Sequence, residues 1–228
     1  MREIVLDTET TGLDPLSGHR LVEIGCVELV NHLPTGEIFH KYLNPERDMP
    51  EEAFRIHGLS ADFLAGHPVF AEVVADFLEF IGEAPLVIHN AEFDMRFLNA
   101  ELARLGFPAL SMTRAVDTVV IARKRFPGAQ ANLDALCRRF EIDNAHRTKH
   151  GALLDAELLA EVYLQLIGGR QPGLELAVGR TAAAQAAAVT TRQRREPRLH
   201  APSPEELEAH RTFVAKLKNA IWLRDPAG

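Results

Sequence analysis

The chain has 228 residues, of which 46% are hydrophobic, so it is long enough for one well-buried domain and an appendage. No stretch resembles a signal peptide or is long enough to cross a bilayer, so we expect a cytoplasmic protein with no membrane partner. The net charge of −7 is carried mainly by residues 1–168. This acidity argues against tight, autonomous binding to a long duplex, because phosphate contacts normally come from Lys and Arg.

The first part of the chain is predicted to form three strands joined by short links. These strands are residues 2–7, 20–31 and 36–43. Val22, Ile24 and Cys26 alternate with Glu23 and Gly25, as in a strand whose two faces differ. The short links favour an antiparallel meander. Cys26 lies in an apolar pattern typical of a buried thiol, as does Cys137 later in the chain.

Helices and strands alternate in the next part of the chain. An apolar stripe at helical spacing covers residues 70–81, and a buried strand follows at 85–89. The further predicted elements are a helix at 92–105, a strand near 115–116, and helices at 117–126, 132–140 and 151–168. A meander followed by this alternation indicates an α/β fold, with a mixed sheet that is covered by helices on both faces.

Three short acidic motifs lie at boundaries of these elements. They are the segments 7–12, 89–94 and 150–155, which contain Asp7, Glu9, Asp94, His150 and Asp155. Taken singly, each motif could be a solvated loop, a helix cap or a surface histidine. Carboxylates brought together from all three would repel one another unless cations lay among them. Hard divalent metals such as Mg²⁺ meet that need.

The motifs resemble those of the DEDD superfamily of 3′→5′ exonucleases, in the branch that carries a catalytic histidine. Within that branch, the chain most resembles the proofreading epsilon subunits of bacterial DNA polymerase III. The segments that carry the resemblance are residues 4–12, 56–58, 87–94, 133–137 and 150–156. The resemblance implies a ribonuclease H-like fold with a mixed five-stranded sheet, in which the first and fourth strands are adjacent and parallel.

The resemblance also implies roles for individual side chains. Asp7, Glu9, Asp94 and Asp155 would hold two divalent metal ions, Mg²⁺ or Mn²⁺. His150 would be the general base, a role that suits the unperturbed pKa of histidine. The reaction would hydrolyse the terminal phosphodiester at a 3′ end and release a nucleoside 5′-monophosphate. The residues implied to contact the substrate are Glu9, Glu52, His57 and Asp155.

Residues 1–169 are thus predicted to form an exonuclease domain, and the character of the chain changes beyond them. Residues 170–202 hold an alanine-rich run and a basic cluster but few large apolar residues, so we predict a flexible linker. Within it, Gln171, Leu174 and Leu176 resemble the short motif by which bacterial replication proteins bind the sliding clamp. A fragment of ordinary linker explains this segment nearly as well.

Residues 203–228 are predicted to form a tail whose amphipathic helix spans 203–223. Ser203 and Glu206 have the spacing of a capping box, with Pro204 at the first helical position. One helix beyond a linker has no core of its own, so it either folds back or binds a partner. We favour a partner, because the only Trp lies in this helix. The residues expected to bind it are Leu207, Val214, Leu217, Ile221 and Trp222.

The resemblance implies that this partner is the catalytic, or alpha, subunit of the replicative polymerase. The sliding clamp and a small third core subunit are further candidates, and the substrate would be a DNA 3′ end. An RNA-trimming member of the superfamily is the nearest alternative, but such an enzyme has no need of a tethered helix. A non-enzymatic scaffold is disfavoured because all five catalytic positions are filled. We therefore predict a proofreading 3′→5′ exodeoxyribonuclease that removes mispaired 3′-terminal nucleotides.

Overall fold

The computed structural model describes residues 1–145, 147, 149–169 and 201–218. These residues belong to two compact units, and each unit is described by itself. No helix among the described residues is long and apolar enough to cross a membrane.

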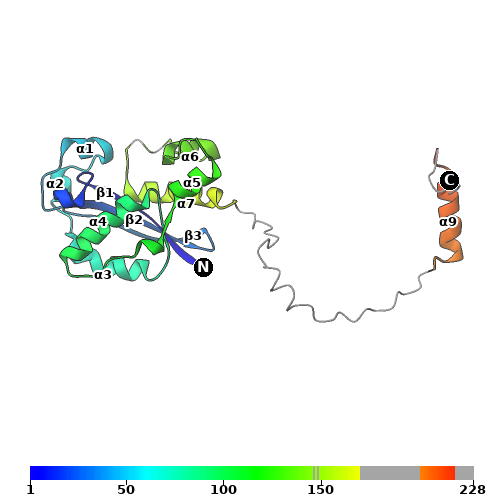
Figure 1. Ribbon diagram of the computed structural model, residues 1–228, viewed down its shortest axis with the longest axis horizontal. Helices are drawn as coiled ribbons and strands as arrows, with labels where there is room; N and C mark the ends of the chain where they lie inside the picture. The colour runs from blue at the N-terminus through cyan, green and yellow to red at the C-terminus, as the bar shows by residue number, and fades with distance from the viewer. Residues whose placement is uncertain (146, 148, 170–200, 219–228) are drawn as a thin grey trace. The chain divides into compact units, whose positions relative to one another are not determined.

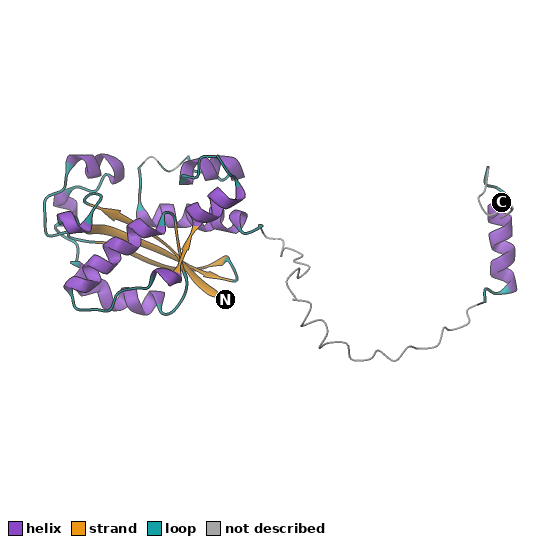
Figure 2. Cartoon of the chain, viewed as in Figure 1, coloured by secondary structure: helices purple, strands orange, loops and turns teal. Residues whose placement is uncertain are grey.

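Five strands form one mixed sheet in the order β3-β2-β1-β4-β5 (Figures 1 and 2). Their bounds are β1 (Arg2–Thr10), β2 (Leu21–Val30), β3 (Leu33–Tyr42), β4 (Leu86–Ile88) and β5 (Ala115–Asp117). The first three form an antiparallel meander, whereas β4 runs parallel to both β1 and β5. The predicted meander and the parallel pairing of the first and fourth strands are therefore confirmed.

Seven helices and two short 3₁₀ helices accompany the sheet in the described part of residues 1–169. Their bounds are η1 (Pro15–Ser17), α1 (Glu51–His57), α2 (Ala61–Leu64), α3 (Phe70–Ile81), α4 (Ala91–Arg104), η2 (Met112–Arg114), α5 (Thr118–Arg125), α6 (Leu133–Phe140) and α7 (Ala152–Leu166). The helices predicted between residues 70 and 168 agree with these bounds to within two residues. The sequence did not predict α1 and α2, because helices this short show too little of a 3.6-residue period.

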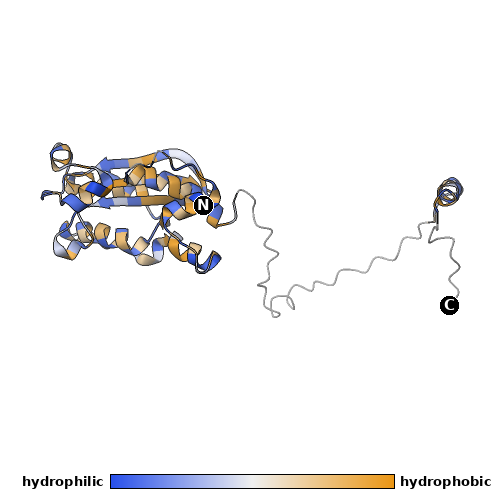
Figure 3. Ribbon diagram, turned by 90° about the horizontal axis from the view of Figure 1, so that it is seen from above, coloured by the Kyte–Doolittle hydropathy of each residue, from blue (hydrophilic) through white to orange (hydrophobic). Residues whose placement is uncertain are grey.

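Alternate residues of the central strand supply the cores on the two faces of the sheet. Ile4 and Leu6 of β1 belong to a buried cluster with α3 and α4, whereas Val5 belongs to a second cluster with α6 and α7. Cys26 and Cys137 are buried free thiols, one in each cluster, as predicted. Because both faces of β1 are covered, Ile4, Val5 and Leu6 are all apolar without alternation. Figure 3 shows apolar and polar residues interspersed along the helices and strands of the first unit.

One glycine lets α7 approach the sheet closely. A Cβ built on Gly25 of β2 would lie 2.3 Å from the carbonyl carbon of Ala152 and from the backbone nitrogen of Leu153. Gly25 is also opposite Asp7 in the pairing of β1 with β2. The absent side chain therefore brings the first turn of α7 directly over the strand pair that carries Asp7.

The second unit contains α9 (Pro204–Val214). Ser203 and Glu206 form the predicted capping box, and Pro204 occupies the first turn. The helix is shorter than predicted, because Lys216 and Leu217 donate to carbonyls three residues back and so leave the α-helical pattern. Several predicted features lie outside the described residues: the linker 170–200, the candidate clamp residues Gln171, Leu174 and Leu176, and Ile221 and Trp222 of the tail.

Candidate active site

Asp7 and Glu9 lie two residues apart on β1, so both side chains leave the same face of the sheet. The strand continues to Thr10, because this stretch pairs with β2 and places Glu9 opposite Glu23. The acidic motif thus lies within the strand, whereas the sequence placed the end of the strand at residue 7. Cross-strand pairing supplies hydrogen bonds that the local sequence does not reveal.

Asp94 comes from the first turn of α4, directly after β4. It is buried, and Thr8 Oγ1 donates a hydrogen bond to Asp94 Oδ1 at 2.6 Å. Asn90 precedes the helix with a φ of 68°, a left-handed conformation that Asn tolerates better than most residues, and its side chain does not cap the helix. Asp117 of β5 accepts hydrogen bonds from the backbone N–H groups of Asn90 and Ala91. These bonds fix the direction in which α4 leaves the sheet.

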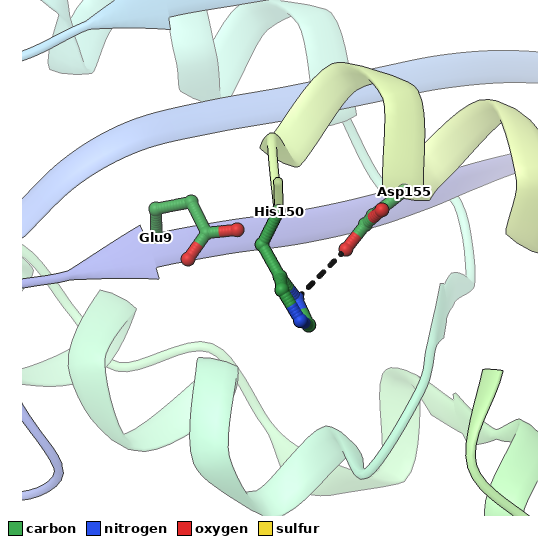
Figure 4. A group of neighbouring side chains, drawn as sticks. All are labelled: Glu9, His150 and Asp155. Carbon is green, nitrogen blue, oxygen red and sulfur yellow. Dashed lines mark ion pairs between the residues drawn. The ribbon is translucent and has the colours of Figure 1, made fainter. Parts of the chain in front are cut away.

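His150 and Asp155 come from the start of α7. The backbone N–H of His150 donates to the carbonyl oxygen of Ile56 at 3.2 Å, which holds this segment against α1. His150 Nδ1 lies 3.3 Å from Asp155 Oδ2. Glu9, His150 and Asp155 each offer a ligand atom within 4.8 Å of the others, and Figure 4 shows the three side chains directed toward one another.

A cation of the chain itself contacts this group. The Arg147 guanidinium pairs with both oxygens of Asp155, at 2.5 Å from Nε to Oδ1 and 2.6 Å from Nη2 to Oδ2. Arg147 Nη1 donates to Asp134 Oδ1 of α6 at 2.8 Å. Such two-pronged pairs are among the strongest hydrogen bonds in proteins. Arg147 therefore connects α6 to the first turns of α7.

Burial and mutual repulsion raise three of the four carboxyl pKa values. The pKa of Asp7 lies well above its ordinary value, first because of burial and then because of Asp94, Glu9 and Asp155. Burial and neighbouring acids raise the pKa of Glu9 to about 8, and burial raises the pKa of Asp94 to about 7. Burial acts on Asp155 as well, but the hydrogen bonds from Arg147, together with the nearby His150, outweigh it and lower the pKa of that carboxyl. The cluster thus has the oxygen donors and the excess negative charge that a hard divalent cation requires.

A cleft of about 510 Å³ lies beside this cluster and shares Glu9 with it. Residues of β1, of the loop after it and of α1 line the cleft, among them Glu52 and His57, with Phe93 of α4 at one side. His57 Nδ1 accepts a hydrogen bond from the backbone N–H of Leu59 at 3.0 Å, so the ring proton lies on Nε2. Burial lowers the pKa of His57 to about 4, which keeps the ring neutral at physiological pH.

The structure therefore brings together all five residues predicted for catalysis, and both further substrate residues line the adjacent cleft. Sequence reasoning missed three polar residues that hold this arrangement: Thr8, Asp117 and Arg147. Thr8 lies inside the first motif, and Arg147 lies three residues before the third. Their closeness to a motif in the sequence was the only signal that could have drawn attention to them. Neither position could indicate a contact with Asp94 or with Asp155.

Comparison with known sequences decides the family. The sequence family described as exonuclease, RNase_T, matches residues 4–163. The chain belongs to this exonuclease family. It is 50% identical over 228 residues to DNA polymerase III subunit epsilon of Rickettsia conorii, covering 97% of this chain and 99% of that protein. It is 45% identical over 219 residues to the subunit of that name in Escherichia coli, covering 92% of this chain and 90% of that protein.

Solved structures of exonucleases have the same fold. Exonuclease X in complex with 5′ overhanging duplex DNA has a TM-score of 0.58 at 23% identity, covering 81% of this chain and 97% of that one. The nuclease domain of 3′hExo, a DEDDh family member bound to rAMP, has a TM-score of 0.63 at 19% identity, covering 73% of this chain and 91% of that one. The predicted ribonuclease H-like architecture is therefore confirmed. Exonucleases of this type use divalent metal ions.

Proposed function

We propose that this protein is the proofreading 3′→5′ exonuclease of a bacterial replicative DNA polymerase and that it hydrolyses mispaired 3′-terminal nucleotides. The observation that carries the proposal is the convergence of Asp7, Glu9, Asp94, Asp155 and His150 at the carboxyl ends of β1 and β4. In open α/β sheets, ligands bind at that edge. The match to epsilon subunits along nearly the whole chain supports the assignment to a polymerase.

The four carboxylates are the proposed ligands of two divalent ions, Mg²⁺ or Mn²⁺. Asp7 is the central ligand, because the other three acids all act on its pKa. Glu9 and Asp155 would complete one ion site, and Asp94 would serve the other. Such a pair of ions supplies charge stabilisation to the attacking and leaving oxygens of a phosphodiester. Thr8 orients Asp94 for this task through its 2.6 Å hydrogen bond.

His150 is the proposed general base. Its side chain is about half exposed, so water can reach the ring, and Asp155 Oδ2 lies 3.3 Å from Nδ1. A hydrogen bond from Nδ1–H to Asp155 leaves Nε2 free to accept the proton of the attacking water. The backbone contact of His150 with Ile56 sets the position of the ring relative to the cleft.

The cleft beside the cluster is the proposed site of the terminal nucleotide. Glu52 offers a carboxylate, and the neutral His57 offers the Nε2 proton. The cleft also contains apolar surface from Phe93 and Ile56, against which a base or sugar can pack. A neutral donor suits a nucleoside better than a phosphate, which would favour a charged one.

The tail is the proposed attachment to the catalytic alpha subunit of the polymerase. Leu207 and Leu217 are exposed, and so is Phe213, which the sequence analysis did not select; Val214 is buried. Residues 1–169, 170–202 and 203–228 would then be the nuclease domain, the linker and the tail. Binding of Gln171, Leu174 and Leu176 to the sliding clamp, and of a small third core subunit, are extensions of the same proposal. Cytoplasmic localisation goes with this role.

Digestion of three matched substrates tests the activity. The full chain is incubated with 3′-mispaired DNA, fully paired DNA and RNA of the same sequence, with Mg²⁺ or with EDTA. We expect Mg²⁺-dependent release of nucleoside 5′-monophosphates, fastest from the mispaired DNA, because a frayed end costs less unstacking. RNA degraded faster than either DNA would favour the RNA-trimming alternative.

A further inference from the structure

Arg147 forms an ion pair with Asp155, the carboxylate that is a proposed ligand of the metal ion. Its Nε and Nη2 atoms lie 2.5 and 2.6 Å from the two oxygens of Asp155, and only 8% of the Arg147 side chain is exposed. The planar fork of the guanidinium matches a carboxylate with two parallel bonds. Arg147 uses one lone pair of each Asp155 oxygen and places a positive charge beside both, so it opposes the binding of a divalent cation to the same oxygens.

The charge of Arg147 acts on the rest of the cluster as well. It lowers the pKa values of Asp7 and Glu9 against the larger opposing effects of burial and neighbouring acids. Its third contact, from Nη1 to Asp134 at 2.8 Å, fixes the guanidinium from the side of α6. Arg147 therefore supplies a positive charge that partly offsets the crowded carboxylates.

The same guanidinium determines which nitrogen of His150 carries the proton. Arg147 Nη2 lies 2.9 Å from His150 Nδ1, and a guanidinium N–H can only donate. Nδ1 must then accept, so the proton of the neutral ring lies on Nε2, and neither nitrogen is free to accept the proton of a water molecule. Removal of Arg147 from this position would let Nδ1–H donate to Asp155, at 3.3 Å, and would free Nε2.

We propose that Arg147 is a positioning residue that competes with the divalent cation for Asp155 and, through its contact with Nδ1, prevents His150 from acting as a base until Arg147 is displaced. This inference rests on the proposed function, since it takes Asp155 as a metal ligand and His150 as the base. It goes further by assigning a role to a residue outside the acidic motifs.

Metal binding without DNA tests the competition. The affinity of the full chain for Mg²⁺ is measured by calorimetry for wild type, Arg147→Gln and Arg147→Lys. Arg138→Gln is the matched control, because Arg138 is an exposed arginine of α6 that, within the described part of the chain, forms no hydrogen bond or ion pair with Asp155. We expect Arg147→Gln to bind Mg²⁺ roughly tenfold more tightly than wild type, equal to about 1.4 kcal/mol, and to melt at a lower temperature without metal. The control should match wild type in both respects.

Arg147→Lys keeps the charge but loses the fork, so its Mg²⁺ affinity should fall between those of wild type and Arg147→Gln. If Arg147→Gln does not fold, the comparison of Mg²⁺ affinity between Arg147→Lys and wild type still tests the competition. Equal or weaker Mg²⁺ binding by both Arg147 variants would overturn the competition, since a purely structural arginine would only weaken the site. If wild type itself bound no Mg²⁺, the proposed function would fail and not only this inference.

The imidazole ¹⁵N chemical shifts of His150 supply a readout that is independent of affinity. We expect the proton on Nε2 in the metal-free protein, and on Nδ1 after saturation with Mg²⁺. In Arg147→Gln, the proton should already lie on Nδ1 without metal. A wild-type ring that carries a proton on Nδ1 in the metal-free protein would overturn the proposed control of His150.

Discussion

At the scale of single residues, the acidic cluster combines two kinds of carboxyl group. Asp7, Glu9 and Asp94 are crowded, Glu9 and Asp94 are buried and Asp7 is partly buried, and the pKa values of all three are raised. Asp155 is also buried, but Arg147 keeps it ionised. The metal-free site therefore has one carboxylate that is held by an arginine and three that bind protons more readily than free side chains do. Asp155 differs from the other three acids because it alone among them forms a two-pronged pair with Arg147, and not because of its residue type.

The raised pKa values predict how the stability of the metal-free protein depends on pH. The pKa of Glu9 rises from 4.5 to about 8, so between these values the folded protein binds more protons than the unfolded chain. Stability from this group is therefore full below about pH 4.5 and is lost as the pH rises toward 8. Urea unfolding in EDTA at pH 5 to 8 should show the decline as a difference between wild type and Glu9→Gln.

The comparison with Glu9→Gln is needed because His57 also changes the pH dependence of the free energy of unfolding. The pKa of His57 is lowered to about 4 in the folded protein, so its contribution makes stability rise with pH below 6.5, opposite to the effect of Glu9. Saturating Mg²⁺ should remove the decline, since the cation keeps the carboxylates ionised in the folded state. A difference that stayed constant from pH 5 to 8 in EDTA would contradict the raised pKa of Glu9.

Replacing one carboxylate separates catalysis from stability. Asp94→Asn keeps the size of the side chain but removes a buried charge, so the metal-free protein should melt at the same or a higher temperature. Hydrolysis should fall by roughly three orders of magnitude, as expected when a metal ligand is lost. Asp76→Asn, on the exposed face of α3, is the control and should change neither quantity much. Retention of most activity by Asp94→Asn would contradict its role as a ligand.

At the scale of elements, the sequence predicts the helices and strands whose apolar residues recur with a clear period. The stripe over Phe70–Ile81 predicts α3, because its apolar residues recur over three turns. The extension of β1 to Thr10 could not be predicted, since it depends on pairing with a strand more than ten residues away. Likewise, α1 has seven residues and no side-chain cap, and its few local signals, such as the acidic first turn and Gly58 at its end, are too weak over so short a segment to predict a helix. The catalytic residues were found from motifs, whereas the residues that position them depend on long-range contacts.

The contact of α7 with β2 predicts a large effect from one methyl group. In Gly25→Ala, the added Cβ would overlap the backbone of Ala152 and Leu153, which cannot move as a flexible side chain could. We expect a loss of about 1–3 kcal/mol in the free energy of unfolding, measured with urea, together with reduced hydrolysis, because α7 carries Asp155. Gly66→Ala meets only one atom, at 4.0 Å, and is the matched control. Equal stability of the two variants would contradict the close packing of α7.

At the scale of the whole molecule, the proposed function would divide recognition between the two units. The unit that carries the active site is acidic overall and offers a narrow cleft, which suits a few terminal nucleotides. An enzyme of this kind works faster when a partner raises its effective concentration at the primer end. The capped helix α9 and its exposed apolar residues are suited to provide that attachment.

The attachment predicts a variant that separates binding from catalysis. Leu207→Asp combined with Leu217→Asp places charges on two exposed apolar positions of the tail. The full-length double variant should lose co-purification with the polymerase catalytic subunit and should hydrolyse short single-stranded DNA at the wild-type rate. Glu208→Gln, on the same helix, should retain both properties. Undiminished binding by the double variant would show that the tail is not the attachment.

The most direct test of the central claim measures nucleotide release from a 3′-mispaired primer by wild type and Asp7→Asn. With Mg²⁺, wild type should release nucleoside 5′-monophosphates one at a time from the 3′ end, and EDTA should stop the reaction. Asp7→Asn should be slower by at least about a thousandfold, because Asp7 is the acid on which the other three converge. Activity of Asp7→Asn within tenfold of wild type, or products that carry a 3′ phosphate, would contradict a metal-dependent 3′→5′ exonuclease at this site.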